Sequence, residues 1–159
     1  MRIITLIIAC LSMALGAAVV TNANAGSKDY EIQKPDKEWR SVLDKQAYRV
    51  LRQQGTERAY TSPLLKESRH GLYRCAACGQ EVFASDHKFD SGTGWPSFYQ
   101  PAAGNMVESK TDFKIGYPRT EVHCARCGGH LGHVFKDGPE PTGLRYCING
   151  AALNFTPIP

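Results

Sequence analysis

The chain lacks a strong excess of either charge. Its 159 residues carry 19 Lys and Arg against 15 Asp and Glu, a formal net charge of +4. Because binding to a polyanion usually requires a more basic surface, we expect no nucleic-acid partner. The chain also lacks low-complexity tracts, and apolar residues make up 42% of it. A disordered tail and a fibrous protein are therefore excluded, and the length suits one domain with one core.

Cysteine is too infrequent for a miniprotein held together by many disulfides, which excludes that class. Four of the six cysteines nevertheless form two Cys-x-x-Cys pairs, and this is the only internal repeat in the sequence. The cysteines are Cys10, Cys75, Cys78, Cys124, Cys127 and Cys147.

The first 25 residues contain no acidic side chain. Arg2 is followed by an apolar run from Ile3 to Val20 and then by the small residues around Ala23 and Ala25. This pattern is typical of a secretory signal peptide, residues 1–25, cleaved after Ala25. A retained membrane anchor is the alternative, because a span needs about 20 apolar residues. Cleavage would remove Cys10 and leave five cysteines, so that one thiol has no partner.

The rest of the chain divides into a polar linker, residues 26–35, and one domain, residues 36–159. Apolar residues recur at helical spacing from Asp36 to Gln54, so this segment is predicted to be helical and to pack on the core through Trp39, Val42, Leu43, Tyr48, Val50 and Leu51. Asp44 is a candidate N-cap, which allows two short helices, and Gly55 is a stop signal. From Leu72 onward, short apolar or aromatic runs alternate with turn residues, and segments such as 121–123 and 145–148 have the length of strands. This pattern predicts a mainly β domain.

The two Cys-x-x-Cys pairs share one format, since a glycine follows the second cysteine of each. Such a pair forms a tight turn that points both sulfurs at one ion, and the glycine permits a positive φ. Four thiolates, Cys75, Cys78, Cys124 and Cys127, match a closed tetrahedral site for one structural zinc ion. Two redox-active disulfides are the alternative in an exported protein.

Cys147 is the thiol left over, and an unpaired thiol is a hazard in an oxidising compartment. Arg145 would share its face of a β-strand, and a nearby cation lowers the pKa of a thiol. His130 and His133 could supply an acid or a base, although they could instead be zinc ligands. His70, His87 and His123 have no comparable setting and are interpreted as surface or packing residues.

Aromatic residues follow two glycines in the segment from Gly92 to Phe98. Trp95 and Phe98 could form an apolar wall for a methyl or thioether group, and both are candidate substrate-binding residues. For Phe98 the alternative is packing in an aromatic corner of the core.

Three segments together with the two CxxCG units resemble methionine sulfoxide reductase B from about Asp36 to Phe155. The segments are FDSGTGWPSF, RTEVHCARCGGHLGHVF and DGPEPTGLRYCINGAALNF. The resemblance implies a β-tent of two antiparallel sheets with short N-terminal helices and a structural zinc on the four paired cysteines. It also implies reduction of the R epimer of methionine sulfoxide, in proteins or free.

The resemblance assigns roles to the remaining candidates. Cys147 matches the nucleophile, and Trp95 matches the tryptophan that packs on the substrate methyl. His133, His130, Asn149 and Arg145 match polar active-site residues, with His133 the first choice of proton donor. Attack on the sulfoxide would leave Cys147 as a sulfenic acid. The expected partners are oxidised proteins and a reductant, and the protein is expected to be a monomer without stable membrane insertion, in a bacterial periplasm.

Thr93 departs from the pattern, because many relatives carry a resolving cysteine at that place. With no other free cysteine, the sequence predicts a one-cysteine enzyme that an external thiol or a thioredoxin-like protein reduces. A zinc-ribbon binding module and a thiol–disulfide oxidoreductase are the rival functions. The first leaves Cys147, Trp95 and the histidine pair unexplained, and a tightly held zinc would exclude the second.

Overall fold

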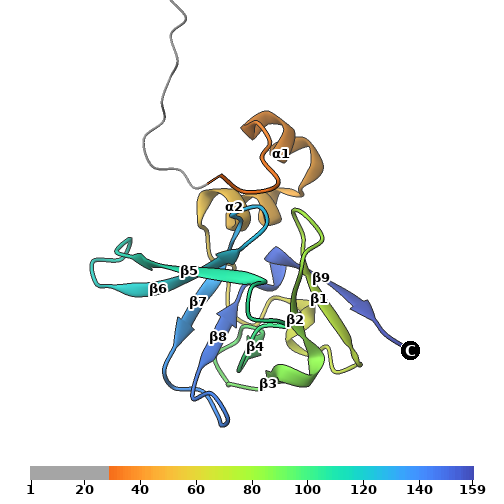
Figure 1. Ribbon diagram of the computed structural model, residues 1–159, viewed down its shortest axis with the longest axis vertical. Coiled ribbons are helices and arrows are strands. Elements are labelled where there is room, and N and C mark those ends of the chain that lie inside the picture. The colour runs from red at the N-terminus through yellow and green to blue at the C-terminus, as the bar shows by residue number, and fades with distance from the viewer. Residues whose placement is uncertain (1–28) are drawn as a thin grey trace, which may run out of the picture.

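The computed structural model of the protein describes residues 29–159. The proposed signal peptide, Cys10 and the first residues of the linker lie outside this range. The described chain folds into two short α-helices followed by two antiparallel sheets, as the sequence predicted (Figure 1). The helices are α1 (Asp36–Val42) and α2 (Lys45–Gln53). The strands are β1 (Gly71–Cys75), β2 (Glu81–Ala84), β3 (Lys88–Phe89), β4 (Ser97–Phe98), β5 (Val107–Asp112), β6 (Arg119–Cys124), β7 (His130–Phe135), β8 (Arg145–Ile148) and β9 (Leu153–Pro157).

The helical segment divides at Asp44, which was one of the two outcomes that the sequence allowed. The Asp44 carboxylate accepts hydrogen bonds from the backbone N–H groups of Gln46 and Ala47, so it caps the N-terminus of α2. Leu43 is extended between the helices, which ends α1 after two turns. The predicted packing role of Val42 is wrong, because this side chain is 57% exposed and α1 buries only Trp39.

The sheets contain three and six strands. The smaller has the order β2-β1-β9, and the larger has the order β3-β4-β8-β7-β6-β5. The predicted strand segments 121–123 and 145–148 lie in β6 and β8. An aromatic cluster joins the two sheets, with the Phe83 ring of β2 stacked on Phe98 of β4 at a centroid distance of 4.5 Å. The core therefore lies between the sheets.

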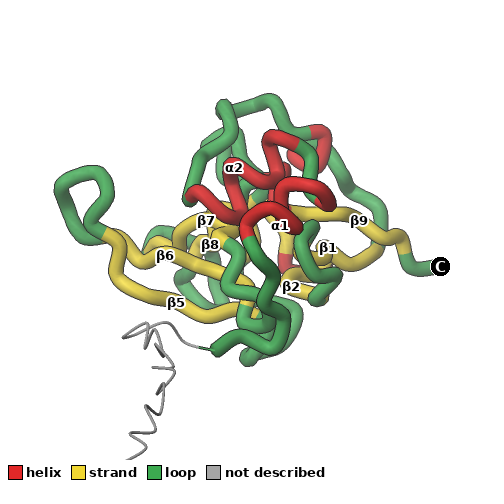
Figure 2. The backbone as a smooth tube through the Cα atoms, turned by 90° about the horizontal axis from the view of Figure 1, so that it is seen from above, coloured by secondary structure: helices red, strands yellow, loops and turns green. Residues whose placement is uncertain are grey.

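Helix α2 packs against β7 of the larger sheet and against the 3₁₀ turn Gly150–Ala152 that leads into β9. Its buried face is Ala47, Tyr48, Val50 and Leu51. The β5–β6 hairpin extends away from this body (Figure 2). None of the helices among residues 29–159 has the length and apolar character needed to cross a membrane.

Candidate active site and metal centre

The two Cys-x-x-Cys turns lie at the ends of strands from different sheets. Cys75 is the last residue of β1 and Cys124 is the last residue of β6. In each turn a backbone N–H bonds back to the first cysteine: Gly79 N to Cys75 O at 2.8 Å, and Gly128 N to Cys124 O at 2.9 Å. Gly79 and Gly128 adopt φ of 76° and 68°, the left-handed conformation that the glycines were expected to permit.

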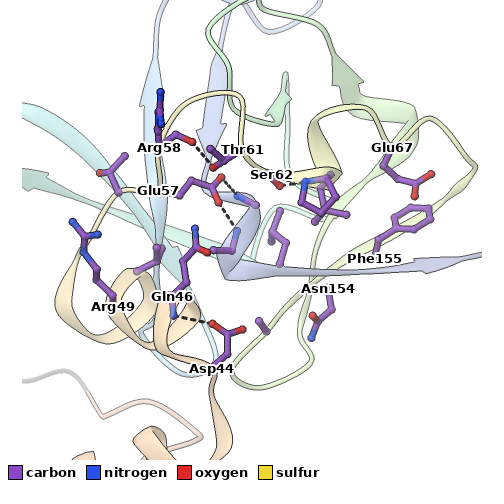
Figure 3. Close-up of a pocket in the computed structure, with 18 of the residues that line it drawn as sticks. Asp44, Gln46, Arg49, Glu57, Arg58, Thr61, Ser62, Glu67, Asn154 and Phe155 are labelled. Carbon is purple, nitrogen blue, oxygen red and sulfur yellow. Dashed lines mark hydrogen bonds between the residues drawn. The ribbon is translucent and has the colours of Figure 1, made fainter.

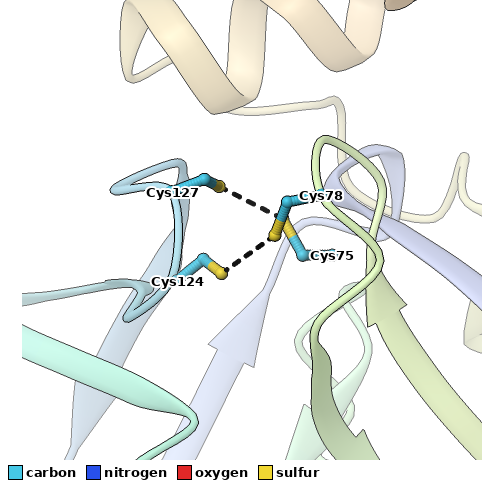
Figure 4. Close-up of side chains that lie close together, drawn as sticks. All are labelled: Cys75, Cys78, Cys124 and Cys127. Carbon is cyan, nitrogen blue, oxygen red and sulfur yellow. Dashed lines mark hydrogen bonds between the residues drawn. The ribbon is translucent and has the colours of Figure 1, made fainter. Parts of the chain in front are cut away.

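The four sulfurs lie within 4.8 Å of one another and point toward a common centre (Figure 4). The distance is 3.8 Å between the Sγ atoms of Cys75 and Cys127, and 3.5 Å between those of Cys78 and Cys124. A tetrahedral ion with metal–sulfur bonds of about 2.3 Å places its sulfurs about 3.8 Å apart, so the cluster has the dimensions of a metal site. All five cysteines of the described chain are free thiols, and none is in a disulfide.

Cys147 lies in the middle of the larger sheet. In the ladders it pairs with Ser97 of β4 on one side and His133 of β7 on the other. Strand β8 approaches β7 closely because residue 132 is glycine: a Cβ there would lie 2.1 Å from the carbonyl oxygen of Cys147.

The Cys147 side chain opens into a cavity of about 140 Å³ that is lined by three further predicted site residues, Trp95, His133 and Asn149. The rest of the lining is Thr56, Arg119, Gly132 and Phe135. The Trp95 indole N–H donates to the carbonyl oxygen of Glu57 at 3.2 Å, which fixes the plane of the ring at the cavity wall. The fold therefore brings together a thiol, an aromatic face and an imidazole from three separate segments.

Burial raises the pKa of the Cys147 thiol, although the Thr93 hydroxyl and the Arg145 guanidinium both act to lower it. The sequence predicted that Arg145 would make this thiol more acidic, and the net direction is the opposite. Desolvation of the buried thiol is the main reason, and the Arg145 contacts add to it. Its guanidinium bonds both carboxylate oxygens of Asp137, at 3.0 and 2.8 Å, and lies over the Phe135 ring. The neighbouring carboxylate offsets part of the positive charge that would otherwise stabilise a thiolate.

His133 and His130 are held by different carboxylates. His133 Nε2 lies 2.8 Å from Asp112 Oδ2, and His130 Nδ1 lies 2.8 Å from Glu121 Oε1. The two rings meet edge to face, with centroids 5.4 Å apart. Only His133 lines the Cys147 cavity, whereas both line an adjoining cavity of about 280 Å³. Neither joins the four-cysteine cluster, so the alternative of histidine zinc ligands finds no support.

Burial lowers the pKa of His133, and the hydrogen bond with Asp112 opposes that shift. The pKa of Asp112 is in turn held well below its usual range by His133 and by neighbouring donors that include Arg119. Arg119 Nη2 lies 2.6 Å from the same Asp112 oxygen. The imidazole thus lies between a thiol and a firmly ionised carboxylate.

Asn149 and Phe98 are both buried, and their contacts stabilise the fold. The Asn149 side chain is 3% exposed, accepts from Glu57 N at 2.9 Å and donates to Leu131 O at 2.9 Å. It touches the cavity while joining two backbone segments. Phe98 is fully buried in the aromatic cluster with Phe83 and does not line the cavity, so the substrate-binding assignment for Phe98 is corrected to the packing alternative.

Glu57 holds the turn that follows Asn149. Its buried carboxylate accepts from Gly150 N at 2.5 Å and Ala151 N at 2.9 Å, beside a groove of about 730 Å³ (Figure 3). Burial raises the pKa of Glu57, and these two backbone donors oppose that shift. Glu57 therefore supports the turn that follows Cys147 and Asn149 in the chain.

The sequence interpretation missed Asp112, Arg119, Glu121 and Glu57. Arg119 and Glu121 lie two residues apart in β6, so they share one face of the strand, and this period-two spacing of charged residues could have indicated them. Asp112 and Glu57 gave no local signal. His70, His87 and His123 lie outside the cavity and bond to Asp86, Gln100 and Glu108.

Comparison with known proteins gives a consistent result. Residues 43–157 match the SelR domain family. The proteins called peptide methionine sulfoxide reductase MsrB include relatives from Leptospira interrogans, Leifsonia xyli and Agrobacterium fabrum. The Leptospira relative is 55% identical over 127 residues, 80% of this chain and 97% of its own length. The Leifsonia relative is 56% identical over 135 residues, which are 84% of this chain and 97% of that relative. The Agrobacterium relative is 52% identical over 128 residues, which are 80% of this chain and 95% of that relative.

Proposed function

The chain belongs to the SelR domain family of peptide methionine sulfoxide reductases, and from that premise we propose that its domain, residues 36–159, reduces the R epimer of methionine sulfoxide with Cys147 as the nucleophile. The observation that carries this proposal is the cavity that Cys147 shares with Trp95 and His133. A thiol, an apolar ring and a proton-carrying ring are the three groups that a sulfoxide requires.

In the proposed reaction the Cys147 thiolate attacks the sulfoxide sulfur. The oxygen leaves that sulfur only when it is protonated, and His133 is the proton donor because it pairs with Cys147 in the ladder and lines the same cavity. In net terms the oxygen atom passes to Cys147, the substrate sulfur gains two electrons as the sulfide, and Cys147 becomes a sulfenic acid. His130, Asn149 and Arg145 take no proton in this scheme and position the groups that do.

Three separate contacts give the preference for one epimer. A sulfoxide sulfur carries a methyl group, an oxygen and the rest of the methionine chain, in an arrangement of fixed hand. The methyl group lies on the Trp95 face, the oxygen points to His133, and the sulfur faces Cys147. Exchanging oxygen and methyl would place a polar atom on the apolar ring and leave the imidazole without an acceptor, which costs binding energy.

Recycling requires an external reductant, because Thr93 offers no thiol to the sulfenic acid. Two thiol equivalents, from a small thiol or a thioredoxin-like protein, restore the Cys147 thiol and release water and a disulfide. The protein substrates are oxidised polypeptides that expose methionine sulfoxide.

The four-cysteine cluster binds zinc in this proposal, because four thiolates at these separations suit a closed tetrahedral ion. Such an ion leaves no open position for substrate. It fastens the end of β1 in one sheet to the end of β6 in the other, so its role is structural.

Residues 1–25 are proposed to export the protein to a periplasm, on the strength of Arg2, the apolar run and the Ala23–Ala25 site. The test is the mass of the protein recovered from the exporting cell. A chain that begins at Gly26 supports cleavage, and a chain that retains its first residues in the membrane fraction refutes it.

The proposed activity is tested with a peptide that contains methionine sulfoxide, separated into its R and S epimers, and dithiothreitol as reductant. The expected result is reduction of the R epimer alone, and its loss in Cys147→Ser. Cys78→Ser is unsuitable as a control because it alters the cluster, so Ser109→Ala on the exposed face of β5 is used instead. Reduction of the S epimer, or activity that survives Cys147→Ser, refutes the proposal.

A further inference from the structure

Three hydroxyl groups form a line from the Cys147 sulfur into the protein. Thr93 Oγ1 lies 3.9 Å from Cys147 Sγ, Ser91 Oγ lies 2.8 Å from Thr93 Oγ1, and Ser97 Oγ lies 2.8 Å from Ser91 Oγ. The line ends where the Ser97 hydroxyl donates to the carbonyl oxygen of Trp95 at 3.2 Å. Ser97 is fully buried and pairs with Cys147 in the β4–β8 ladder. The reaction described above assigns no role to Ser91 or Ser97.

The number of protons in this line fixes its direction when Cys147 is a thiol. Each hydroxyl has one proton to donate, and the Trp95 carbonyl can only accept. Ser97 therefore donates to the carbonyl, Ser91 to Ser97, Thr93 to Ser91, and the thiol to Thr93. All four contacts are then satisfied, and every proton points away from the sulfur.

The thiolate has one proton fewer, so one contact must be given up. Its sulfur can only accept, and Thr93 is the hydroxyl within reach. If Thr93 turns to donate to the sulfur, Ser91 loses that donor and retains the long backbone contact from Thr93 N, at 3.5 Å. If Ser91 and Ser97 turn as well, the Trp95 carbonyl loses the Ser97 proton. Because Ser97 is buried, no water reaches its hydroxyl to replace the hydrogen bond that is lost there.

We propose that Thr93, Ser91 and Ser97 form a proton-ordered hydroxyl chain that reverses when Cys147 ionises, and that Ser97 is the positioning residue that holds the chain pointed away from the sulfur. This inference rests on the proposed role of Cys147 as a thiolate nucleophile. The chain keeps the free thiol protonated at rest and supplies one hydrogen bond to the anion when it forms.

Charged and titratable groups also face this sulfur from the neighbouring elements, and the test must leave them unchanged. They are Arg145 of β8 with its partner Asp137, His133 of β7 with its partner Asp112, and Arg119 of β6. Within the loop, Asp90 accepts from Gly92 N at 2.9 Å. Substitution of hydroxyl groups alone alters none of these charges.

The test is the rate of alkylation of Cys147 by iodoacetamide as a function of pH, in the full chain with its metal, read by mass spectrometry of the peptide that contains Cys147. Thr93→Val removes the Thr93 hydroxyl from the sulfur, so the midpoint of the curve of rate against pH moves to higher pH. Ser97→Ala releases Ser91 and Thr93 to turn toward the sulfur, so the midpoint moves to lower pH. Each shift is expected to be about one pH unit, a tenfold change in thiolate fraction. Thr93→Ser keeps the native midpoint.

The double variant Thr93→Val/Ser97→Ala separates this chain from a simple loosening of the site. If Ser97 acts through the Thr93 hydroxyl, the double variant has the midpoint of Thr93→Val alone. If Ser97→Ala merely admits water around the sulfur, it lowers the midpoint equally in both backgrounds, and the proposal is overturned. An unchanged or raised midpoint in Ser97→Ala also overturns it.

Ser91→Ala serves if Ser97→Ala does not fold, because Ser91 is less buried and its loss likewise releases the Thr93 proton toward the sulfur. Its midpoint is expected to fall, and a midpoint that stays or rises overturns the proposal. Alkylation needs no sulfoxide, so this result is independent of the proposed function. A protein that is inactive on both epimers but shows these shifts would refute the function and leave the hydroxyl chain standing.

Discussion

His133 and Cys147 are direct partners in the antiparallel ladder between β7 and β8, so their side chains emerge on the same face of the sheet. Both line one cavity, and Asp112 bonds His133 from the adjacent hairpin. A proton donor and a nucleophile that share a ladder position keep their separation as long as the sheet is intact. The chemistry proposed for this site therefore depends on strand register.

Asp112→Asn is expected to move the alkaline limb of the activity profile to lower pH. Burial lowers the pKa of His133 and the Asp112 carboxylate opposes that shift, so removing the negative charge lowers the pKa further. The protonated donor is then lost at lower pH, and activity at neutral pH falls by about tenfold. The measurement is the initial rate on the R epimer from pH 5 to 9.

Asp86→Asn is the matched control for that prediction. Asp86 pairs with His70 at 3.1 Å on the exposed surface, away from the cavity. The activity of Asp86→Asn as a function of pH should match that of the native protein. A native alkaline limb in Asp112→Asn would contradict the assignment of His133 as the donor.

Cys124→Ser is expected to destabilise the domain and reduce its metal content. A serine hydroxyl is a poor zinc ligand, and the cluster connects strands of both sheets. The melting temperature should fall by at least about 10 °C, which corresponds to about 3 kcal/mol in a domain of this size. Metal analysis and thermal unfolding by circular dichroism measure the two effects.

Cys147→Ser is the matched cysteine control, and it should keep one metal ion per chain and the native melting temperature. If Cys124→Ser also keeps its metal, the four-cysteine cluster is not the binding site.

Glu57→Gln is expected to lower the free energy of unfolding by about 1–3 kcal/mol, because a buried backbone donor loses its acceptor. The carboxylate accepts from Gly150 N and Ala151 N through separate oxygens, whereas the glutamine amide has one oxygen and turns its NH₂ group toward the second donor. Urea unfolding measures the change.

Glu81→Gln, which breaks a partly exposed ion pair with Arg74, should cost less than about 1 kcal/mol. Equal losses for the two substitutions would show that Glu57 contributes no more than a surface carboxylate.

Thr93→Cys is expected to convert the enzyme to a two-cysteine cycle. Thr93 Oγ1 lies 3.9 Å from Cys147 Sγ, so a small side-chain rotation brings a sulfur at this position within bonding distance. After one turnover without reductant, the variant should contain a disulfide between positions 93 and 147. The native protein should instead react at Cys147 with a reagent for sulfenic acids.

Thr93→Ser, which has no thiol, is the control and should behave as the native protein. A native protein that forms an intramolecular disulfide at Cys147 would refute the one-cysteine cycle.

The sequence allowed the local features of the fold and the site to be predicted. The Asp44 cap and the two cysteine turns with their glycines depend on residues a few positions apart. The partners of the histidines could not be predicted in the same way. Asp112 reaches His133 only because β5, β6 and β7 lie side by side in a particular register. Nothing within a few residues of His133 specifies that neighbour.

By itself, the sequence determined the chemistry that this protein carries: four cysteines with the spacing of a metal site, and a separate thiol with an arginine two residues away. The tertiary structure decided how that chemistry is tuned. It buried Cys147 so that desolvation outweighs Arg145, placed Phe98 in the core rather than the cavity, and set three hydroxyls in line with the sulfur. The physical reason is that ligand identity is a covalent property of the chain, whereas burial and hydrogen-bond partners arise only when distant strands pack.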